Sequence, residues 1–196
     1  MIIIGITGTI GAGKGEVVAY LKSNGFTHFS ARDFLTEEVV RRGLVINRDT
    51  TTNVANDLRT THSPSYIIEQ LYARALAHAE AGQENNVILE SIRTPGEVDF
   101  LRENSKKVGG ARFYLIAIDA DPKMRYERIS KRKSAMDNVS FEKFIQDEKR
   151  EMASTNPNEG NIAECVRRAD FTIKNEGSVT ELYTQIDAFL PTILKK

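Results

Sequence analysis

A glycine-rich segment near the start of the chain has the spacing of a phosphate-binding loop. Gly8 is followed by four residues and then by Gly13 and Lys14, directly after the apolar residues 1–7. Glycines let successive backbone N–H groups approach phosphate oxygens, and a helix beginning near Lys14 adds its N-terminal dipole. The lysine supplies a mobile positive charge. Because the loop stands between an apolar strand and an amphipathic helix, we predict a P-loop that holds the phosphates of a nucleotide.

The loop departs from the full pattern at one position. Gly15, followed by Glu16, stands where a serine or threonine hydroxyl usually reaches Mg²⁺. The metal must then be held through waters on a nearby carboxylate. Adenylate-kinase-like enzymes also have Gly-Lys-Gly here, which favours small-molecule kinases over GTPases and motor ATPases. The residues expected to bind ATP are Gly8, Gly11, Ala12, Gly13, Lys14, Gly15 and Glu16.

Composition narrows the class of protein. The chain has 196 residues, 40% of them hydrophobic and 28% charged, which suits one soluble domain over residues 1–196. The 27 basic and 27 acidic side chains give no net charge, which disfavours a general nucleic-acid binder. The single cysteine, Cys165, excludes an internal disulfide and is expected to pack in a helix. No segment approaches membrane-spanning length and no leader is recognisable, so we expect a cytoplasmic protein.

Short apolar segments alternate with helical patterns along the chain. Such alternation predicts a parallel sheet covered by helices on both faces, with ligands bound at the carboxyl ends of the strands. Together with the P-loop, it predicts an α/β fold of the P-loop NTPase type. We expect a three-layer sandwich with a mostly parallel five-stranded sheet and a small mobile lid. The expected strands are residues 1–7, 28–30, 87–89, 113–118 and 171–173.

Two segments between these strands are assigned to ligand binding. Ser63-Pro64 has the form of an N-cap followed by proline at the first helical position, after a polar segment, 44–62, that we take as a loop. Residues 44–80 are the expected acceptor-binding segment. The expected lid region is 122–153, with a polar lid loop at 134–140.

Charged residues follow the second expected strand. Ser30, Arg32 and Asp33 stand where a carboxylate and a guanidinium would hold an acceptor. A helix cap with first-turn charge would account for Ser30 and Asp33 equally well. The two interpretations stay open at this stage.

Glu90 and Arg93 follow the third strand, close to the expected position of the P-loop. Glu90 suits Mg²⁺-bound waters and Arg93 suits a phosphate, which it would grip with two parallel hydrogen bonds. We favour this interpretation over a surface ion pair, because this strand end must lie near the loop.

A later helix carries a stripe of arginines. Arg125, Arg128 and Arg132 share one helical face, as i, i+3 and i+7. They suit a polyphosphate whose charge shifts during phosphoryl transfer, although a solvated basic helix would look the same. His28, His62 and His78 are scattered and are assigned no role.

With these residues in place, the chain resembles the P-loop nucleoside monophosphate kinase group. Residues 30–35 are similar to that group's acceptor segment Ser-Thr-Gly-Asp-x-Leu-Arg, with Thr36 in place of the final arginine. Residues 90–93 are similar to its Asp-Gly-(Phe/Ile)-(Pro)-Arg segment, with Glu90 in place of aspartate. The missing arginine contact would come from Arg32 or Arg59.

A closer resemblance, over nearly the whole chain, is to adenylate-kinase-like and dephospho-CoA-kinase-like proteins of archaea and bacteria. It rests on residues 53–59, 91–98, 120–128 and 169–178. In related kinases the loop after the last strand borders adenine, which implies base-side roles for Asn175 and Gly177. Related domains beside deoxycytidylate deaminases make a pyrimidine or deoxynucleotide acceptor plausible.

The sequence therefore predicts an ATP- and Mg²⁺-dependent kinase acting on a nucleoside or deoxynucleoside monophosphate. Its other hypotheses are a dephospho-CoA kinase, favoured by a roomy 44–62 loop, and a nucleotide-binding regulatory protein with weak ATPase activity. The expected partner is a small-molecule acceptor, with no nucleic acid or membrane, and protein partners are not predicted. The catalytic candidates are Lys14, Arg93, Arg125 and Arg128, the acceptor-binding candidates are Ser30, Arg32, Asp33, Arg59 and Arg93, and Glu90 holds the metal through water.

Overall fold

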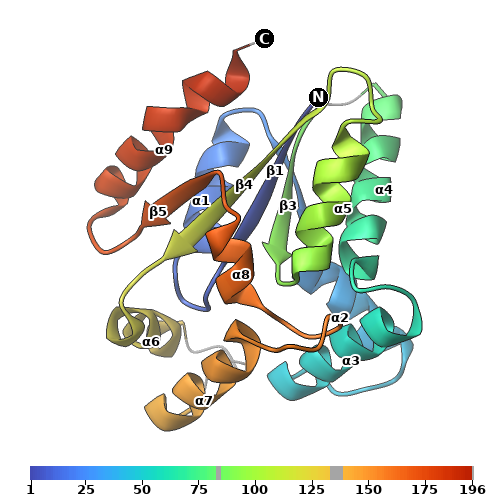
Figure 1. Cartoon of the computed structure of the whole chain (residues 1–196). Coiled ribbons are helices and arrows are strands. Elements are labelled where there is room, and N and C mark those ends of the chain that lie inside the picture. Colours follow the sequence, from blue (N-terminus) through green and yellow to red (C-terminus); the bar gives the residue numbers. More distant parts are fainter. Residues whose placement is uncertain (83–84, 133–138, 196) are drawn as a thin grey trace.

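Five parallel strands form one sheet in the order β2-β3-β1-β4-β5 in the computed structural model, which describes residues 1–82, 85–132 and 139–195. The sheet places β1 at its centre, between β3 and β4 (Figure 1). The predicted α/β fold of the P-loop NTPase type is confirmed. The strands are β1 (Ile2–Gly8), β2 (Thr27–Ser30), β3 (Asn86–Ile92), β4 (Arg112–Asp119) and β5 (Phe171–Lys174).

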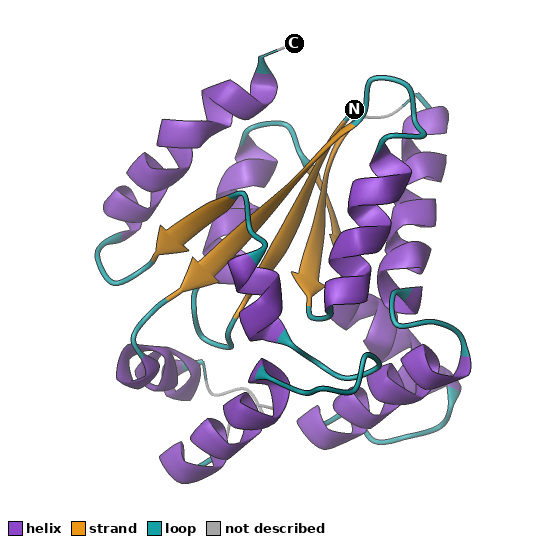
Figure 2. Ribbon diagram, viewed as in Figure 1, coloured by secondary structure: helices purple, strands orange, loops and turns teal. Residues whose placement is uncertain are grey.

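Helices cover both faces of the sheet, as the ribbon diagram shows (Figure 2). The helices are α1 (Lys14–Ser23), α2 (Ala31–Arg41), α3 (Arg48–Thr61), α4 (Tyr66–Glu80), α5 (Pro95–Ser105), α6 (Pro122–Lys131), α7 (Phe141–Met152), α8 (Ile162–Arg167) and α9 (Val179–Leu194). Among the described residues, no helix combines the length and apolar character needed to cross a bilayer.

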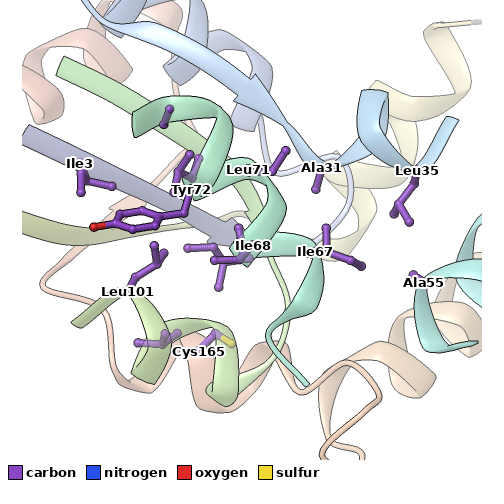
Figure 3. Packing of buried hydrophobic residues seen from close by; sticks show 14 of the residues in the cluster. Ile3, Ala31, Leu35, Ala55, Ile67, Ile68, Leu71, Tyr72, Leu101 and Cys165 are labelled. Carbon is purple, nitrogen blue, oxygen red and sulfur yellow. The ribbon is translucent and has the colours of Figure 1, made fainter. Parts of the chain in front are cut away.

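Two apolar cores lie on opposite faces of the sheet because alternate residues of a strand point to opposite sides. Ile3 of β1 packs into a core with α2, α3, α4, α5 and α8, part of which is shown in Figure 3. Ile2 and Ile4 pack with α1 and α9 on the other face. Cys165 is buried in α8, as predicted, and burial raises the pKa of its thiol to about 12.

The structure corrects the prediction for residues 44–62. Most of this segment is helix α3, which begins after Asn47, whose side chain accepts a hydrogen bond from Thr50 N. Val54 and Leu58 lie one turn apart and are buried against α2 and α4, and this packing outweighs the polar character of the remaining residues.

The structure also differs from the prediction at two helices, and the predicted lid loop lies mostly outside the described residues. The helix expected at Ser63-Pro64 begins two residues later, at Tyr66 with Ser65 as N-cap. The helix α8 has no counterpart among the predicted elements. The expected lid loop, 134–140, falls largely on residues 133–138, which lie outside the described part of the chain.

Candidate functional site

The P-loop connects β1 to α1, and its glycines are required by close contacts with other parts of the fold. Gly8 has a φ of +133°, and a Cβ there would stand 2.1 Å from the carbonyl oxygen of Ile118 in β4. Gly13 has a φ of +100°, and a Cβ there would stand 2.1 Å from Nδ2 of Asn175. The loop is therefore held against the carboxyl ends of β4 and β5, where only glycine fits.

Lys14 folds back over this loop. Its Nζ donates hydrogen bonds to the carbonyl oxygens of Gly8, at 2.9 Å, and Thr9, at 2.8 Å. Desolvation by burial and the nearby charge of Arg93 lower the pKa of Lys14 from 10.5 to about 7, against the opposing effects of Glu90 and Glu151. The side-chain amine of Lys14 is thus only partly protonated at neutral pH, and a phosphate group beside it would favour the protonated, charged form.

A cavity of about 380 Å³ opens beside the P-loop. Figure 1 shows α3, α6 and α7 beyond the carboxyl ends of the strands, which is where ligands of parallel sheets bind. The lining of this cavity is rich in cationic side chains. The charged side chains that line it are Lys14, Arg32, Arg48, Arg59, Arg93 and Arg132, with the two carboxylates Glu90 and Glu151.

Glu90 lies at the end of β3, beside β2. His28 of β2 makes a hydrogen bond between its Nε2 and Glu90 Oε2, at 3.0 Å. Burial acts to raise the pKa of Glu90, but the hydrogen bond with His28 and the charges of His28, Lys14 and Arg32 outweigh it, so the pKa is lowered. Glu90 is therefore an ionised carboxylate on the cavity wall. His28, to which the sequence analysis assigned no role, orients it.

A bulge at the end of β3 sets the direction of the residues that follow. Glu90 pairs with Ile6 of β1, but Ile92 pairs with Thr7, so Ser91 is the extra residue. Ser91 has a φ of 74° and is the one positive-φ residue other than glycine in the described chain. The hydroxyl of Thr7 donates to the carbonyl of Ile92, at 2.8 Å, which holds the bulge in place.

Arg59 and Arg93 are organised by one buried carboxylate, Glu97 of α5. Glu97 Oε1 accepts from Nη2 of Arg59 at 2.9 Å, and Oε2 accepts from the backbone N–H of Arg93 at 2.7 Å and of Thr94 at 3.1 Å. The contacts with Thr94 form the capping box of α5. The N–H of Asn161 donates to the carbonyl of Arg93 at 2.8 Å, so the backbone of this arginine is fixed on both sides.

Helix α7 carries three carboxylates that pair with arginines of the site. Glu151 pairs with Arg93, and Glu148 pairs with Arg125. The third, Asp147, is buried and accepts from Nη1 of Arg48 at 3.2 Å and from Lys143. Burial acts to raise the pKa of Asp147, but the hydrogen bonds from Lys143 and Arg48 lower it overall.

The structure brings together some of the predicted site residues and leaves others outside the cavity. The predicted residues that line it are Gly11, Gly13, Lys14, Gly15, Arg32, Arg59, Glu90 and Arg93. Those that lie outside its lining are Gly8, Ala12, Glu16, Ser30, Asp33, Arg125, Arg128, Asn175 and Gly177.

Several residues outside the cavity have structural contacts instead. Ser30 is the N-cap of α2, where its Oγ accepts from the N–H of Asp33. Asn175 donates from Nδ2 to the carbonyl of Ala12, and its own carbonyl accepts from Arg128, both at 2.8 Å. These contacts join the loop after β5 to the P-loop and to α6. The base-side role that the resemblance implies for Asn175 stays a prediction.

Arg125 contacts the P-loop from outside the cavity. It is almost completely buried, and its Nε donates to the carbonyl of Ala120 at 2.7 Å while Nη1 donates to the carbonyl of Ile10 at 3.3 Å. Arg132, which shares its helical stripe, lines the cavity instead.

Six further polar or charged residues of the cavity wall were not singled out from the sequence. Four of them lie on α3, which was taken as a loop, and another, Glu151, lies on α7. An i, i+4 periodicity from Arg48 to Thr52 and Asn56 was the available signal. The six are Arg48, Thr51, Thr52, Asn56, Ser91 and Glu151.

No protein-only metal centre is present within the part of the chain described, where no group of three or more histidine, cysteine, aspartate or glutamate side chains is placed to hold an ion. Mg²⁺ bound with nucleotides takes most of its ligands from water and phosphates, so a single carboxylate on the cavity wall suffices. Glu90 fits that requirement, since it is ionised and lies beside Lys14 on the same wall.

Comparison with known proteins identifies relatives of the whole chain. Residues 4–153 match the family model described as an AAA domain. A UPF0200 protein of Methanocaldococcus jannaschii is 31% identical over 196 residues, covering 99% of this chain and 91% of the relative. A UPF0200 protein of Methanococcus maripaludis is 28% identical, covering 100% and 99% of the two chains.

Solved structures share the fold at lower identity. TT1252 from Thermus thermophilus is 23% identical, with a TM-score of 0.58, and the match covers 100% of this chain and 98% of that one. Shikimate kinase from Acinetobacter baumannii is 17% identical, with a TM-score of 0.58, and the match covers 99% and 95%. At these identities the likeness establishes the fold, which is that of P-loop kinases.

Proposed function

We propose that this chain, which belongs to the AAA domain family and to the UPF0200 proteins, is an ATP-dependent kinase of phosphate-bearing small molecules. The acceptor class that we favour is a nucleoside or deoxynucleoside monophosphate. The observation that carries the proposal is the cavity beside the P-loop, whose wall presents six cationic side chains and two carboxylates. Even with Glu97 and Asp147, which pair with two of these arginines, the five arginines and the partly charged Lys14 outnumber the four carboxylates.

The P-loop supplies the site for the ATP phosphates. Its backbone N–H groups and the N-terminus of α1 favour anions. Lys14 would release the carbonyls of Gly8 and Thr9 and contact the β- and γ-phosphates instead. Glu90 would hold Mg²⁺ through water, and the metal when bound neutralises charge on the transferring phosphates.

The acceptor would lie between α2, α3 and the end of β3. Arg59 and Arg93 are the arginines best placed to hold its phosphate, because Glu97 fixes both of them. Thr52 and Asn56 of α3 line the same cavity and offer neutral hydrogen-bonding groups for the rest of the acceptor. Catalysis would rest on positioning and charge neutralisation, as is general for phosphoryl transfer.

The remaining assignments follow from this proposal. We take residues 44–80 as the acceptor segment, 122–153 as the lid region, and the protein as cytoplasmic. Arg128 stays a candidate for contact with the transferring group, whereas Arg125, which is almost completely buried and donates to the carbonyl of Ile10, would support the P-loop. The segment 44–62 no longer favours dephospho-CoA as the acceptor, because most of it is helix α3, but the resemblance to dephospho-CoA-kinase-like proteins keeps this acceptor as the second candidate.

The test is ADP release from Mg·ATP in the presence of each nucleoside monophosphate, deoxynucleoside monophosphate and dephospho-CoA. We expect one acceptor to raise turnover far above the rate with ATP alone. Lys14→Ala should abolish that increase, whereas Lys22→Ala, a substitution at the other end of α1, should leave it unchanged. A flat response to the whole panel, with ATP bound, would refute the kinase and favour a regulatory nucleotide-binding protein.

A further inference from the structure

Helix α7 places carboxylates against arginines in and around the cavity. Within α7, Asp147, Glu148 and Glu151 fall on one face, and each pairs with a different arginine. The pair that matters most for the proposed function is that of Glu151 with Arg93, because Arg93 lines the cavity together with Lys14 and is proposed to hold the acceptor phosphate. Glu151 accepts from Nη1 of Arg93, so a phosphate group that uses this nitrogen must compete with Glu151.

The two partners of this ion pair are held very differently. Arg93 is fixed through its backbone, by Glu97 on one side and Asn161 on the other, and this fixation does not involve Glu151. Its side chain is 34% exposed. Displacing Glu151 would therefore leave Arg93 in position to bind another anion.

Glu151 lies on a helix with little apolar anchoring. Phe144 and Asp147 are its only buried residues, and none of the described residues of α7 belongs to either apolar core. The aromatic side chains of α7 that contact Tyr126 of α6 are Phe141 and Phe144, which lie near the start of α7, whereas Glu151 lies in its last turn. The backbone of Glu151 packs against Gly160, whereas its side chain contacts the site through the ion pair with Arg93, so another anion could replace the side chain without moving the helix.

We propose that Glu151 is an internal competitor, whose carboxylate pairs with Arg93 where an acceptor phosphate would bind and so lowers the affinity of this position for every external anion. The cost of displacing Glu151 is common to all anions, so only a ligand that binds the guanidinium strongly fills the position at low concentration. A phosphate group carries nearly two charges and three acceptor oxygens, so its exchange with Glu151 is favourable. The inference rests on the proposed function in that it needs an anion-binding cavity, and it assigns to Glu151 the threshold affinity that an acceptor phosphate must exceed.

The test is the binding of inorganic pyrophosphate and of malonate, measured by calorimetry without nucleotide or metal. Glu151→Gln should tighten pyrophosphate binding by about tenfold, and the gain should disappear in the Arg93→Met background, because the two residues are coupled. Glu142→Gln removes the same charge from the first turn of α7, where Glu142 makes no ion pair among the described residues, and should change the affinity less than about twofold. The affinity for malonate should rise by the same factor as that for pyrophosphate, within about twofold, because the cost of displacing Glu151 is common to both anions.

Several results would overturn the inference. They are unchanged or weaker pyrophosphate binding in Glu151→Gln, an equal gain in the Arg93→Met background, an equal gain in Glu142→Gln, a gain for pyrophosphate with none for malonate, or no pyrophosphate binding in any variant. Because these measurements need no turnover, they are independent of the acceptor assay. A protein that passes them but transfers no phosphate would refute the kinase and leave the role of Glu151 standing.

Discussion

Lys14 should take up a proton when ATP binds, because its pKa in the ligand-free protein is far below that of an ordinary lysine. Burial and the charge of Arg93 lower this pKa to about 7. At pH 8 only about a tenth of the molecules then carry a charged Lys14. Phosphates beside the amine favour the ammonium form and return its pKa toward the ordinary value of 10.5. Binding at pH 8 should therefore take up about 0.9 proton per ATP, falling to about 0.5 at pH 7.

The sign of the resulting pH dependence follows from the same shift. The bound state holds more protons than the free state between the two pKa values, so affinity is highest at and below pH 7 and is lost as pH rises. From pH 7 to pH 9 the loss approaches about tenfold per pH unit. The ATP phosphates are fully ionised above pH 7 and do not contribute to this slope.

Calorimetric titration with Mg·ATP at pH 8, in buffers that differ in ionisation enthalpy, measures the proton uptake directly. Lys14→Met should abolish the uptake and weaken binding. Lys22→Met, at the exposed last turn of the same helix, should change neither. The reasoning is refuted if the wild-type protein takes up no proton at pH 8, or if Lys14→Met takes up as many.

Three further predictions concern residues that build the site, and urea unfolding measures the change in stability in each case. Gly13→Ala should lower the free energy of unfolding by at least about 1 kcal/mol, because its Cβ would collide with Asn175, and calorimetry should detect no ATP binding. Gly15→Ala has open space around its Cβ and should not destabilise the protein, so equal losses in the two variants would contradict the packing argument. Glu97→Gln should lower the free energy of unfolding by about 3 kcal/mol, since it leaves the charge of a buried arginine uncompensated, and a loss under about 1 kcal/mol would show that the pair is not organised as described. Ser91→Gly should raise the free energy of unfolding by up to about 1 kcal/mol, because glycine adopts a φ of 74° without strain, and a loss on this substitution would argue that the serine side chain stabilises the bulge.

Local patterns sufficed to predict the sheet and the loop at its centre. The central strand β1, Ile2–Gly8, is mostly apolar and buried at every position, as is typical of a parallel strand covered on both faces. Capping residues located the start of α4 only to within two residues, since the cap predicted at Ser63 is Ser65. The rule that ligands bind at strand ends then placed Glu90 and Arg93 correctly on the cavity wall.

Features that depend on contacts between distant residues escaped prediction. Helix α3 has a mostly polar sequence, and the few apolar residues that hold it, such as Val54 and Leu58, gain their stability from helices elsewhere in the chain. Glu151 and Arg93 are 58 residues apart, and no local pattern links them. Arg125 was expected to face the ligand, but its burial beneath the P-loop depends on how α6 and α7 pack together.

The most direct test of the central claim is to follow the γ-phosphate itself. The protein is incubated with Mg·ATP labelled in that group and with the acceptor panel, and the labelled products are separated. The account predicts that the label moves to the phosphate of one nucleoside or deoxynucleoside monophosphate, and that Arg93→Met reduces this transfer more than it reduces ATP binding. Label that appears only as inorganic phosphate, or that stays on ATP with every acceptor, would contradict it.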